Sequence, residues 1–382
     1  MLNKAEFKEH LINDLLPFWN NLYDNEHGGF YGRVGSNNKI DKHAPKAAVL
    51  QTRILWFYSS CYKSLKDKTE DDEKLLKFAE LQFDFISRYM LAPDDGGIYW
   101  SVGYDGKIKD NNKQTYALAF ALYAVSAYYS VSKNQAALTA ADRLFNLIEN
   151  KFKDEHGYLE AFLLDRRDFK YTRTMNTLLH LIEAYTEYYQ AVKSGESRSA
   201  LRYTLNLVIN KAYNDNLSRT ECYFDEFMNP AGDMTSYGHD IEASWLIYRA
   251  CEVLGDDNIT NNLAPKLEKV AQNVISKGFV DGGRNGIYYD CKNGVDNKQR
   301  SWWVMSEAIV ALVHQHKLYG DSKSIILAEN LWQYVKAYFI SPYGEWYYNI
   351  SESGEPSKGS DDLCNAWKCP YHHGRMCLEI LS

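Results

Sequence analysis

The sequence lacks the features that place a protein in a membrane or on nucleic acid. Its first residues, MLNKAEFKEHLINDLLPFW, carry charges every few positions and hold no uninterrupted apolar run, so they predict neither a signal peptide nor a transmembrane span. A net charge of -7, from 43 basic and 50 acidic residues that are scattered along the chain, provides no basic patch for nucleic acid or an anionic membrane. We therefore expect a cytoplasmic protein whose partner is a small molecule.

The seven cysteines lack the pairing that a disulfide framework or a common metal site requires. Their number is odd, they are dispersed, and no C-x-x-C pair occurs, which favours reduced thiols. The C-terminal run from Cys364 to Cys377, with the spacing C-x4-C-x2-H-H-x3-C, offers thiolates and imidazoles within a short span. Because that spacing matches no standard zinc finger, we assign no metal site to it.

Several sequence motifs of catalysis are also missing. No Walker loop, G-x-G-x-x-G, G-x-S-x-G or H-E-x-x-H occurs, so a nucleotide-binding protein, a serine hydrolase and a zincin all lack their signature. No stretch rich in Pro, Gly or Ser is long enough to separate domains. We expect the whole chain, 1–382, to form one catalytic domain.

Aromatic residues are abundant, and they recur in a repeated signature. They make up 14% of the chain, with 30 Tyr and 9 Trp, and such rings suit the part-apolar surface of a sugar. A glycine and aromatic signature occurs six times at separations of 58 to 68 residues: HGGFYGRV, DGGIYWSV, EHGYLEAF, ECYFDEF, NGIYYD and YGEWYYNI. Each copy predicts a turn followed by a short strand or hairpin, and the sequence between copies has room for two helices.

A helical pattern of apolar residues fills these intervals. It predicts helices near 4–22, 46–66, 72–91, 113–132, 134–153, 174–193, 197–213, 237–254, 259–277, 301–319, 323–339 and 370–381. A unit of two helices and a β turn cannot bury its own faces, so the units must pack side by side. The second helix of each unit is apolar on nearly all faces and the first keeps a charged face, which predicts an inner and an outer ring. We expect an all-α (α/α)6 toroid.

Polar residues in the predicted inner helices are the candidates for chemistry. They are Arg53, Tyr116, Asn176, His180, His239, Glu242, Trp245, Trp303, Glu307, Trp367 and His372. His239 and Glu242 are three residues apart and so share a helix face, as do Asn176 and His180 at four. Glu242 could hold His239 in one tautomer.

A structural explanation exists for each candidate taken singly. One histidine in an apolar helix is more often structural than functional, and Trp245 and Trp303 alone would be core residues. Arg53 alone could be an ion-pair partner of Glu242 or Glu307. Three histidines with paired carboxylates on inner helices favour an active site, because buried ionisable groups persist when they are paired or functional.

Three segments carry a resemblance to a known family. SYGHDIEASW, WWVMSE and WKCPYHHGRM occur in an order and at separations that resemble the N-acylglucosamine 2-epimerase superfamily, most closely its cellobiose 2-epimerases. The resemblance extends from PFWNNLYDNEHGGFYG to CPYHHGRMCLEI, which is essentially the whole chain. It implies an (α/α)6 barrel that inverts C2 of the reducing-end glucose or mannose of a β-1,4-linked disaccharide such as cellobiose, without a metal or nucleotide cofactor.

The resemblance also implies roles for the candidate residues. His239 and His372 look like the two acid/base histidines, and His180 would assist at the ring oxygen or carbonyl. The residues expected to hold sugar hydroxyls and histidines are Arg53, Tyr116, Asn176, Glu242 and Glu307. Trp303 and Trp367 would lie against the sugar, with Trp245 nearby. A neutral imidazole with a pKa near the working pH would remove the C2 proton, and Arg53 would stabilise the enediolate.

The sequence departs from the family in two places, and three alternative functions remain open. The segment before Asn176 is the short, basic LLDRRDFKYTR (163–173), in which Asp168 is a weak candidate for substrate contact, and position 51 is Gln where relatives can carry His or Asn. The alternatives are an aldose–ketose isomerase of the mannose/fructose type, an inverting glycoside hydrolase or lyase with two carboxylates, and a catalytically silent sugar-binding protein. We expect a monomer or weak dimer.

Overall fold

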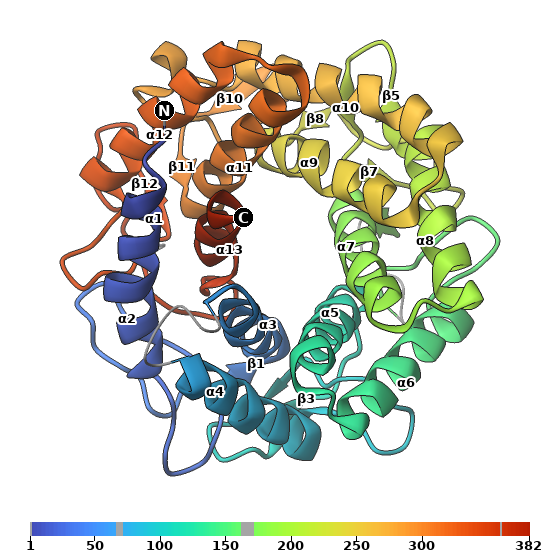
Figure 1. Ribbon diagram of the computed structural model, residues 1–382, viewed down its shortest axis with the longest axis vertical. Coiled ribbons are helices and arrows are strands. Elements are labelled where there is room, and N and C mark those ends of the chain that lie inside the picture. The colour runs from blue at the N-terminus through green and yellow to red at the C-terminus, as the bar shows by residue number, and fades with distance from the viewer. Residues whose placement is uncertain (1, 66–71, 162–171, 360) are drawn as a thin grey trace.

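The computed structural model describes residues 2–65, 72–161, 172–359 and 361–382, which form two concentric rings of helices (Figure 1). The inner ring consists of α3 (Ala48–Leu65), α5 (Thr115–Ser132), α7 (Met175–Val192), α9 (Tyr237–Leu254), α11 (Trp302–Tyr319) and α13 (Tyr371–Leu381). Each inner helix contacts the next one along the chain, and α13 contacts α3, so the ring closes on itself.

The outer ring alternates with the inner ring along the chain. Its members are α1 (Lys4–His10) with η1 (Leu11–Leu15) and α2 (Leu16–Asn20), α4 (Asp72–Phe85) with η2 (Ile86–Met90), α6 (Gln135–Lys151), α8 (Gly195–Leu207) with η4 (Val208–Ala212), α10 (Asp257–Lys277) and α12 (Ser322–Tyr338). The η segments named here are single π-helical turns. The (α/α)6 toroid expected from the sequence is confirmed.

Burial explains which helix takes which ring. The inner helix α5 is buried on all faces from Thr115 to Tyr128, because it packs on both neighbours and on the outer ring. In the outer helix α6 the buried residues recur every three or four positions: Ala137, Ala140, Ala141, Leu144, Phe145 and Ile148. Within the described residues, no helix is both long and apolar enough to cross a bilayer.

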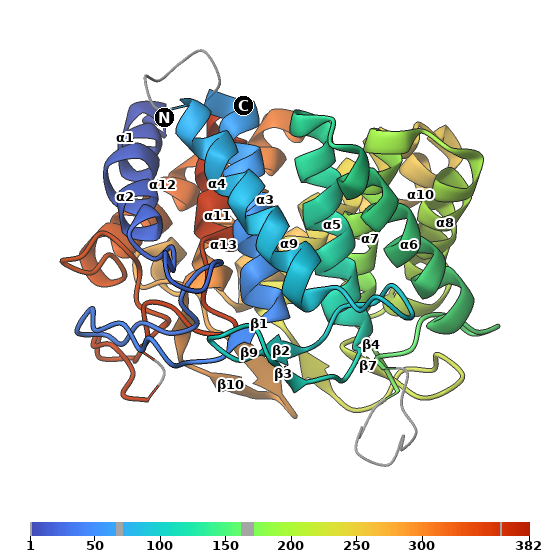
Figure 2. The same cartoon turned by 90° about the horizontal axis from the view of Figure 1, so that it is seen from below.

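Two residues join an inner helix to the next outer helix in four of the repeats. The first takes a left-handed conformation that ends the inner helix, and the side chain of the second caps the outer helix. The pairs are Lys133–Asn134, Lys193–Ser194, Gly255–Asp256 and Gly320–Asp321. These connections lie at the end of the rings away from the strands (Figure 2).

Short strands gather at the opposite end of the rings (Figure 2). They are β1 (Lys46–Ala47), β2 (Ser101–Val102), β3 (Ile108–Asp110), β4 (Arg173–Thr174), β5 (Tyr213–Asn214), β6 (Arg219–Thr220), β7 (Tyr223–Phe224), β8 (Met234–Thr235), β9 (Asp290–Lys292), β10 (Val295–Asn297), β11 (Arg300–Ser301) and β12 (Asn349–Ile350), with a 3-10 turn, η5 (Asp281–Gly283). The pairing is antiparallel, in the orders β1-β2-β3, β10-β9-β8, β11-β12, β4-β7 and β5-β6.

The repeated signature forms less strand than the sequence predicts. In five copies its first aromatic or aliphatic residue makes a single bridge back to the end of the outer helix: Phe30 to Tyr23, Ile98 to Leu91, Tyr158 to Lys153, Ile287 to Phe279 and Trp346 to Ile340. The glycines turn the chain too sharply for a longer ladder. Gly29, for example, has φ 67°, and a Cβ there would lie 2.7 Å from the Phe85 ring.

Ion pairs attach the start of an inner helix to this turn in four repeats, and two of them, Lys46–Asp24 and Lys368–Glu345, are fully buried. They are Lys46–Asp24 at 2.8 Å, Lys113–Asp95 at 2.5 Å, Arg173–Asp154, and Lys368–Glu345 at 2.5 Å. Each cation lies two or three residues before its inner helix. The strand end of the rings is therefore fixed by charge pairs as well as by backbone pairing.

We expect Gly255→Ala to lower the free energy of unfolding by about 1 kcal/mol, because Gly255 has φ 63° and an alanine there keeps a left-handed backbone. Gly195→Ala is the matched control. Both positions have open space around a Cβ, but Gly195 begins α8 with φ outside the left-handed region, so its replacement should raise that free energy by up to about 1 kcal/mol. The midpoint of thermal unfolding measures both, and equal effects would exclude backbone strain as the cause.

Candidate active site

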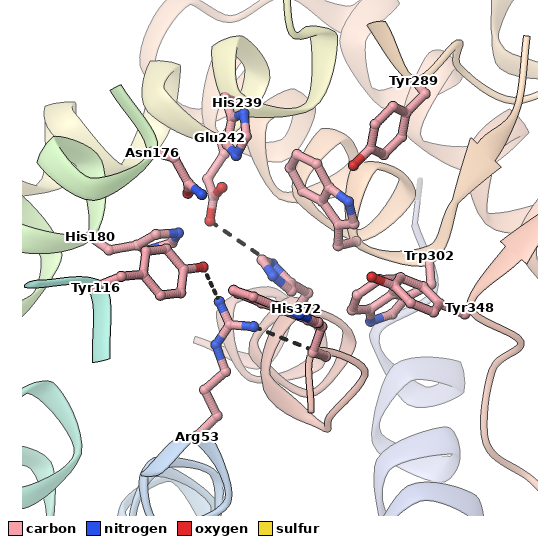
Figure 3. Close-up of a pocket in the computed structure, with 12 residues that line it drawn as sticks. Arg53, Tyr116, Asn176, His180, His239, Glu242, Tyr289, Trp302, Tyr348 and His372 are labelled. Atoms are coloured by element: carbon pink, nitrogen blue, oxygen red, sulfur yellow. Dashed lines mark hydrogen bonds and ion pairs between the residues drawn. The ribbon is translucent and has the colours of Figure 1, made fainter. Parts of the chain in front are cut away.

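A pocket opens at the strand end of the inner ring. Most of its lining residues belong to the first turns of the inner helices (Figure 3). They are Arg53, Tyr116, Asn176, His180, His239, Glu242, Tyr289, Trp302, Trp303, Tyr348, Trp367 and His372. The pocket contains about 610 Å³ of empty space, its mouth included. Nine of the eleven residues proposed from the sequence therefore meet in one cavity.

The other two proposed residues lie behind this lining. Trp245 is 1% exposed, and its indole N–H donates to Glu307 Oε2 at 3.1 Å. Glu307 is fully buried, and its second oxygen, Oε1, lies 2.6 Å from Nδ1 of His372. Trp245 thus orients Glu307, and Glu307 orients His372.

His372 is the second residue of α13, and its ring reaches the pocket from the centre of the inner ring. Glu307 accepts hydrogen bonds from Trp245 and Arg375 and lies 2.6 Å from His372 Nδ1. When Glu307 is ionised, this contact places the proton of the His372 ring on Nδ1 and leaves Nε2 as the basic nitrogen. Burial and the nearby charges of Arg53 and Arg375 lower the pKa of His372 well below its usual value. The ring is therefore neutral and able to accept a proton.

His239 is held by Ser236, not by Glu242. Its Nδ1 lies 2.8 Å from Oγ of Ser236, the residue that also caps the start of α9. The expected contact between Glu242 and His239 is absent among the described residues, because Glu242 Oε1 instead accepts a hydrogen bond from Arg375 at 2.6 Å. Burial, and then the charge of His180, lower the pKa of His239 to about 3, whereas the sequence led us to expect a value near the working pH.

Trp303 lies beside both of these histidines. Its ring centroid is 4.9 Å from that of His239 and 5.6 Å from that of His372. His180 faces the pocket from α7 (Figure 3). Its Nδ1 lies 3.1 Å from Glu183 Oε2. Three imidazoles from three inner helices thus converge on one space.

Arg53 brings a positive charge into the pocket without a carboxylate partner among the described residues. Its Nη2 donates to the Tyr116 hydroxyl at 2.8 Å, and its Nη1 lies 3.5 Å from the carbonyl oxygen of Trp367. The guanidinium also contacts the rings of Phe120 and Tyr371, with its Cζ at 4.1 and 4.6 Å from their centroids. The ion pair that could link Arg53 to Glu242 or Glu307 does not form.

Arg375 is the cation that pairs with those glutamates. Its Nη2 donates to both Glu242 and Glu307 at 2.6 Å, and its Nη1 donates to Glu183. These carboxylates come from α9, α11 and α7, so one side chain of α13 joins three other inner helices. We call Arg375 with Glu183, Glu242 and Glu307 the central cluster.

The charges of the central cluster do not balance, and the pKa values show this. Burial and the charge of Glu307 raise the pKa of Glu242 to about 7, and burial raises that of Glu307 to about 7 in spite of Arg375. Burial alone would raise the pKa of Glu183, but Arg375 and His180 lower it to about 2. Arg375 and His180 thus favour the ionised form of Glu183, whereas burial shifts Glu242 and Glu307 towards the protonated form.

The comparisons with known proteins agree with this geometry. The sequence profile of the N-acylglucosamine 2-epimerase (GlcNAc 2-epimerase) family matches residues 29–372. The chain belongs to the N-acylglucosamine 2-epimerase family. A similar member is the cellobiose 2-epimerase of Ruminococcus albus, 38% identical over 390 residues, which cover 99% of this chain and 98% of the relative.

Two solved structures of the family share the fold closely. A sugar epimerase from a ruminal bacterium superposes with a TM-score of 0.94 at 37% identity, and the cellobiose 2-epimerase of Bacillus thermoamylovorans with a TM-score of 0.93 at 33% identity. In both comparisons the match covers 99% of this chain and 98% of the other. The two rings and their connections are thus those of sugar epimerases of this family.

Three residues that line the pocket were not among those proposed from the sequence. Tyr289, Trp302 and Tyr348 form one wall, in which Trp302 packs edge-on to Tyr348 at 4.5 Å and Tyr289 edge-on to Trp303 at 6.0 Å. Tyr289 and Tyr348 belong to the copies of the repeated aromatic signature that precede α11 and α13. That signature was the feature of the sequence from which they could have been predicted. Trp302 directly precedes Trp303, which was proposed from the sequence.

Arg375 and Glu183 were missed for a different reason. Each lies three residues after a proposed histidine, in HHGR and HLIE, but the ion pair between them joins two different helices. Gln51 is structural, since its side chain bonds both backbone groups of Phe30, at 3.0 and 2.8 Å. Asp168 and most of the basic segment 163–173 lie outside the described residues.

The cysteine and histidine run near the C-terminus is divided among different neighbours. Cys369 lies beside Arg53 at 3.9 Å, and His373 Nε2 lies 2.7 Å from a Glu345 oxygen. Within the described residues, the ligand atoms close enough to share an ion are those of Glu242, Glu307 and His372, all within 4.8 Å of one another. The Arg375 guanidinium already bonds both of these carboxylates.

We expect Arg375→Met to lower the free energy of unfolding by about 3–5 kcal/mol at pH 8, because three buried carboxylates lose their cation. The loss should be smaller at pH 5.5. A carboxyl whose pKa rises on folding costs stability above its unfolded pKa, and at pH 5.5 Glu242 and Glu307 are mostly protonated in the fold.

The control for this prediction is Arg33→Met, which removes an exposed pair with Asp362 at 3.1 Å and should cost less than about 1 kcal/mol at either pH. Thermal unfolding at pH 5.5 and 8 gives the comparison. A loss for Arg375→Met that is the same at both pH values would show that packing, not charge, is what this residue provides.

Proposed function

We propose that this protein is a cellobiose 2-epimerase, which inverts C2 of the reducing-end glucose of cellobiose to give 4-O-β-glucosylmannose. The observation that carries the proposal is the pair of imidazoles, His239 and His372, that face one pocket from different inner helices, each beside Trp303. Inversion at a carbon needs a base on one face and an acid on the other. The printed names of relatives with 38% and 33% identity support the substrate.

The chemistry starts when the sugar ring opens and exposes the C1 aldehyde, which acidifies the C2 proton. A neutral imidazole removes that proton, and both candidates are neutral because burial depresses their pKa values. An enediolate forms, and Arg53 supplies positive charge for its oxygen, since its guanidinium has no carboxylate to neutralise it within the described residues. After rotation about C2–C3 the second histidine, which has taken up a proton from solvent, returns it to the other face of C2, and the first histidine releases its proton to solvent.

The depressed pKa values make the reprotonation step favourable. An imidazolium formed in this pocket is a strong acid, because the site stabilises the neutral ring. His180, held by Glu183, is placed to exchange the proton that ring opening and closure require. Asn176 Oδ1 and Glu242 Oε2 have no hydrogen-bond partner among the described residues, so they are free to accept from sugar hydroxyls.

Aromatic side chains complete the proposed sugar site. Trp367 is 41% exposed at the mouth, and its ring lies 5.6 Å from Tyr116 and 6.0 Å from Trp100. It offers an apolar face to the sugar that lies nearer the mouth. The match of the family to residues 29–372 supports one catalytic domain, and we propose that it works in the cytoplasm as a monomer or weak dimer.

Incubation with cellobiose in heavy water tests the reaction. We expect 4-O-β-glucosylmannose as the first product, with one deuterium at C2, because the proton removed by one histidine is replaced by a solvent-derived proton from the other. NMR spectroscopy of early time points identifies the product and the labelled carbon. Ketose as the main initial product would indicate an aldose–ketose isomerase, and released glucose would indicate a hydrolase.

Variants of the two histidines test the mechanism. His239→Asn and His372→Asn should each lower kcat for epimerisation by roughly 10²–10⁴-fold with the helical circular dichroism spectrum unchanged. Each variant keeps one base, so it should still exchange the C2 proton of one epimer with solvent, and the two variants should prefer opposite epimers. His43→Asn, an exposed site, is the control. Full turnover by either pocket variant would remove that histidine from the mechanism.

A further inference from the structure

A second cavity lies inside the inner ring at the end away from the strands. Its lining residues come from late turns of α3, α5, α7, α9 and α13, whereas those of the active-site pocket lie mainly in the first turns. The cavity contains about 980 Å³ of empty space, its mouth included, and shares no lining residue with the pocket. We call it the rear cavity.

Three polar groups in the rear cavity are more than nine-tenths buried and lack a partner. Trp56, Tyr123 and Glu187 are 5%, 6% and 9% exposed. Within the described part of the chain, no hydrogen bond reaches the Trp56 indole N–H, the Tyr123 hydroxyl or the Glu187 carboxylate. Their polar atoms are open to the cavity, where water or a ligand can bond them. Two donors and one strong acceptor therefore face the same empty space.

The charges around the rear cavity favour a neutral ligand. Lys63 and Arg249 are balanced by Glu187 and Glu379, and Arg249 donates directly to Glu379. Glu187 would repel an anion, and Lys63 and Arg249 would repel a cation, so the cavity favours neither sign of charge in a ligand. A neutral molecule with several hydroxyls can bond donors and acceptors alike.

The aromatic rings add an apolar side to this polar set. Trp56 and Tyr123 stack on each other at 5.5 Å with an angle of 17° between their planes. Ala127 and Leu378 extend the apolar part of the lining. Apolar rings beside convergent hydrogen-bonding groups suit a molecule with an apolar face and a hydroxylated rim, as in a sugar ring.

We propose that the rear cavity is a second binding site, which takes a neutral polyhydroxylated molecule of about the size of a monosaccharide. Trp56 and Tyr123 donate to its hydroxyl oxygens, and Glu187 accepts from its hydroxyl groups. The two sites lie back to back, because Trp56 and Tyr123 pack against Tyr371, at 5.2 and 6.3 Å between ring centroids. The hydroxyl of Tyr371 in turn donates to Glu183 of the central cluster.

Methyl β-D-glucopyranoside is the probe for this site, because it has no reducing end and cannot be epimerised. Calorimetric titration of the full chain should show binding that Glu187→Gln and Tyr123→Phe each weaken by about tenfold or more, the effect of one lost hydrogen bond to a charged or buried group. Both variants change groups without a protein partner among the described residues, so their thermal unfolding midpoints should not fall.

Trp367→Ala is the matched control, since it alters the mouth of the active-site pocket and not the rear cavity. If the probe also enters the pocket, the wild type shows two binding events, of which the rear variants lose one and Trp367→Ala loses the other. The proposal is overturned if the wild type does not bind the probe, or if both rear variants bind it as tightly as the wild type.

Discussion

The hydrogen bonds of Arg375 are the interaction on which the rest of the molecule depends. The ring of six inner helices closes where α13, the last of them, contacts α3. Arg375 joins α13 to α7, α9 and α11 through three buried carboxylates. Since burial of unpaired carboxylates is costly, these helices are held in one arrangement in which the guanidinium reaches all three.

The same arrangement sets the electrostatics of the pocket. Glu307 receives hydrogen bonds from Arg375 and Trp245 and so presents a fixed oxygen to His372. Arg375 and Arg53 add positive charge to a buried site, which keeps the His372 ring neutral. A base therefore remains available where a solvent-exposed histidine would be partly protonated. Structural stability and the protonation state of the site have one physical origin.

Much of the fold follows from the sequence, because helix periodicity and a sixfold signature are local patterns. The same patterns place nine of eleven proposed residues in the pocket, since an apolar helix that carries Arg53 or His180 has few other places for a polar side chain. Partners between helices could not be predicted in this way. Glu242 was assigned to His239 because both share a helix face, whereas its partner Arg375 lies on a different helix, 133 residues along the chain.

The unequal ends of the rings have a consequence for how such a protein can evolve. At one end, connections such as Gly255–Asp256 have only two residues. The first must take a left-handed conformation, and the second must cap the next helix. At the other end, segments such as Asn21–Pro45 carry the chain from an outer to an inner helix and are anchored by buried pairs such as Lys46–Asp24. Insertions and deletions can accumulate there without shifting either ring. Substrate range can thus diversify at the pocket rim while the catalytic histidines, on the inner helices, stay in register.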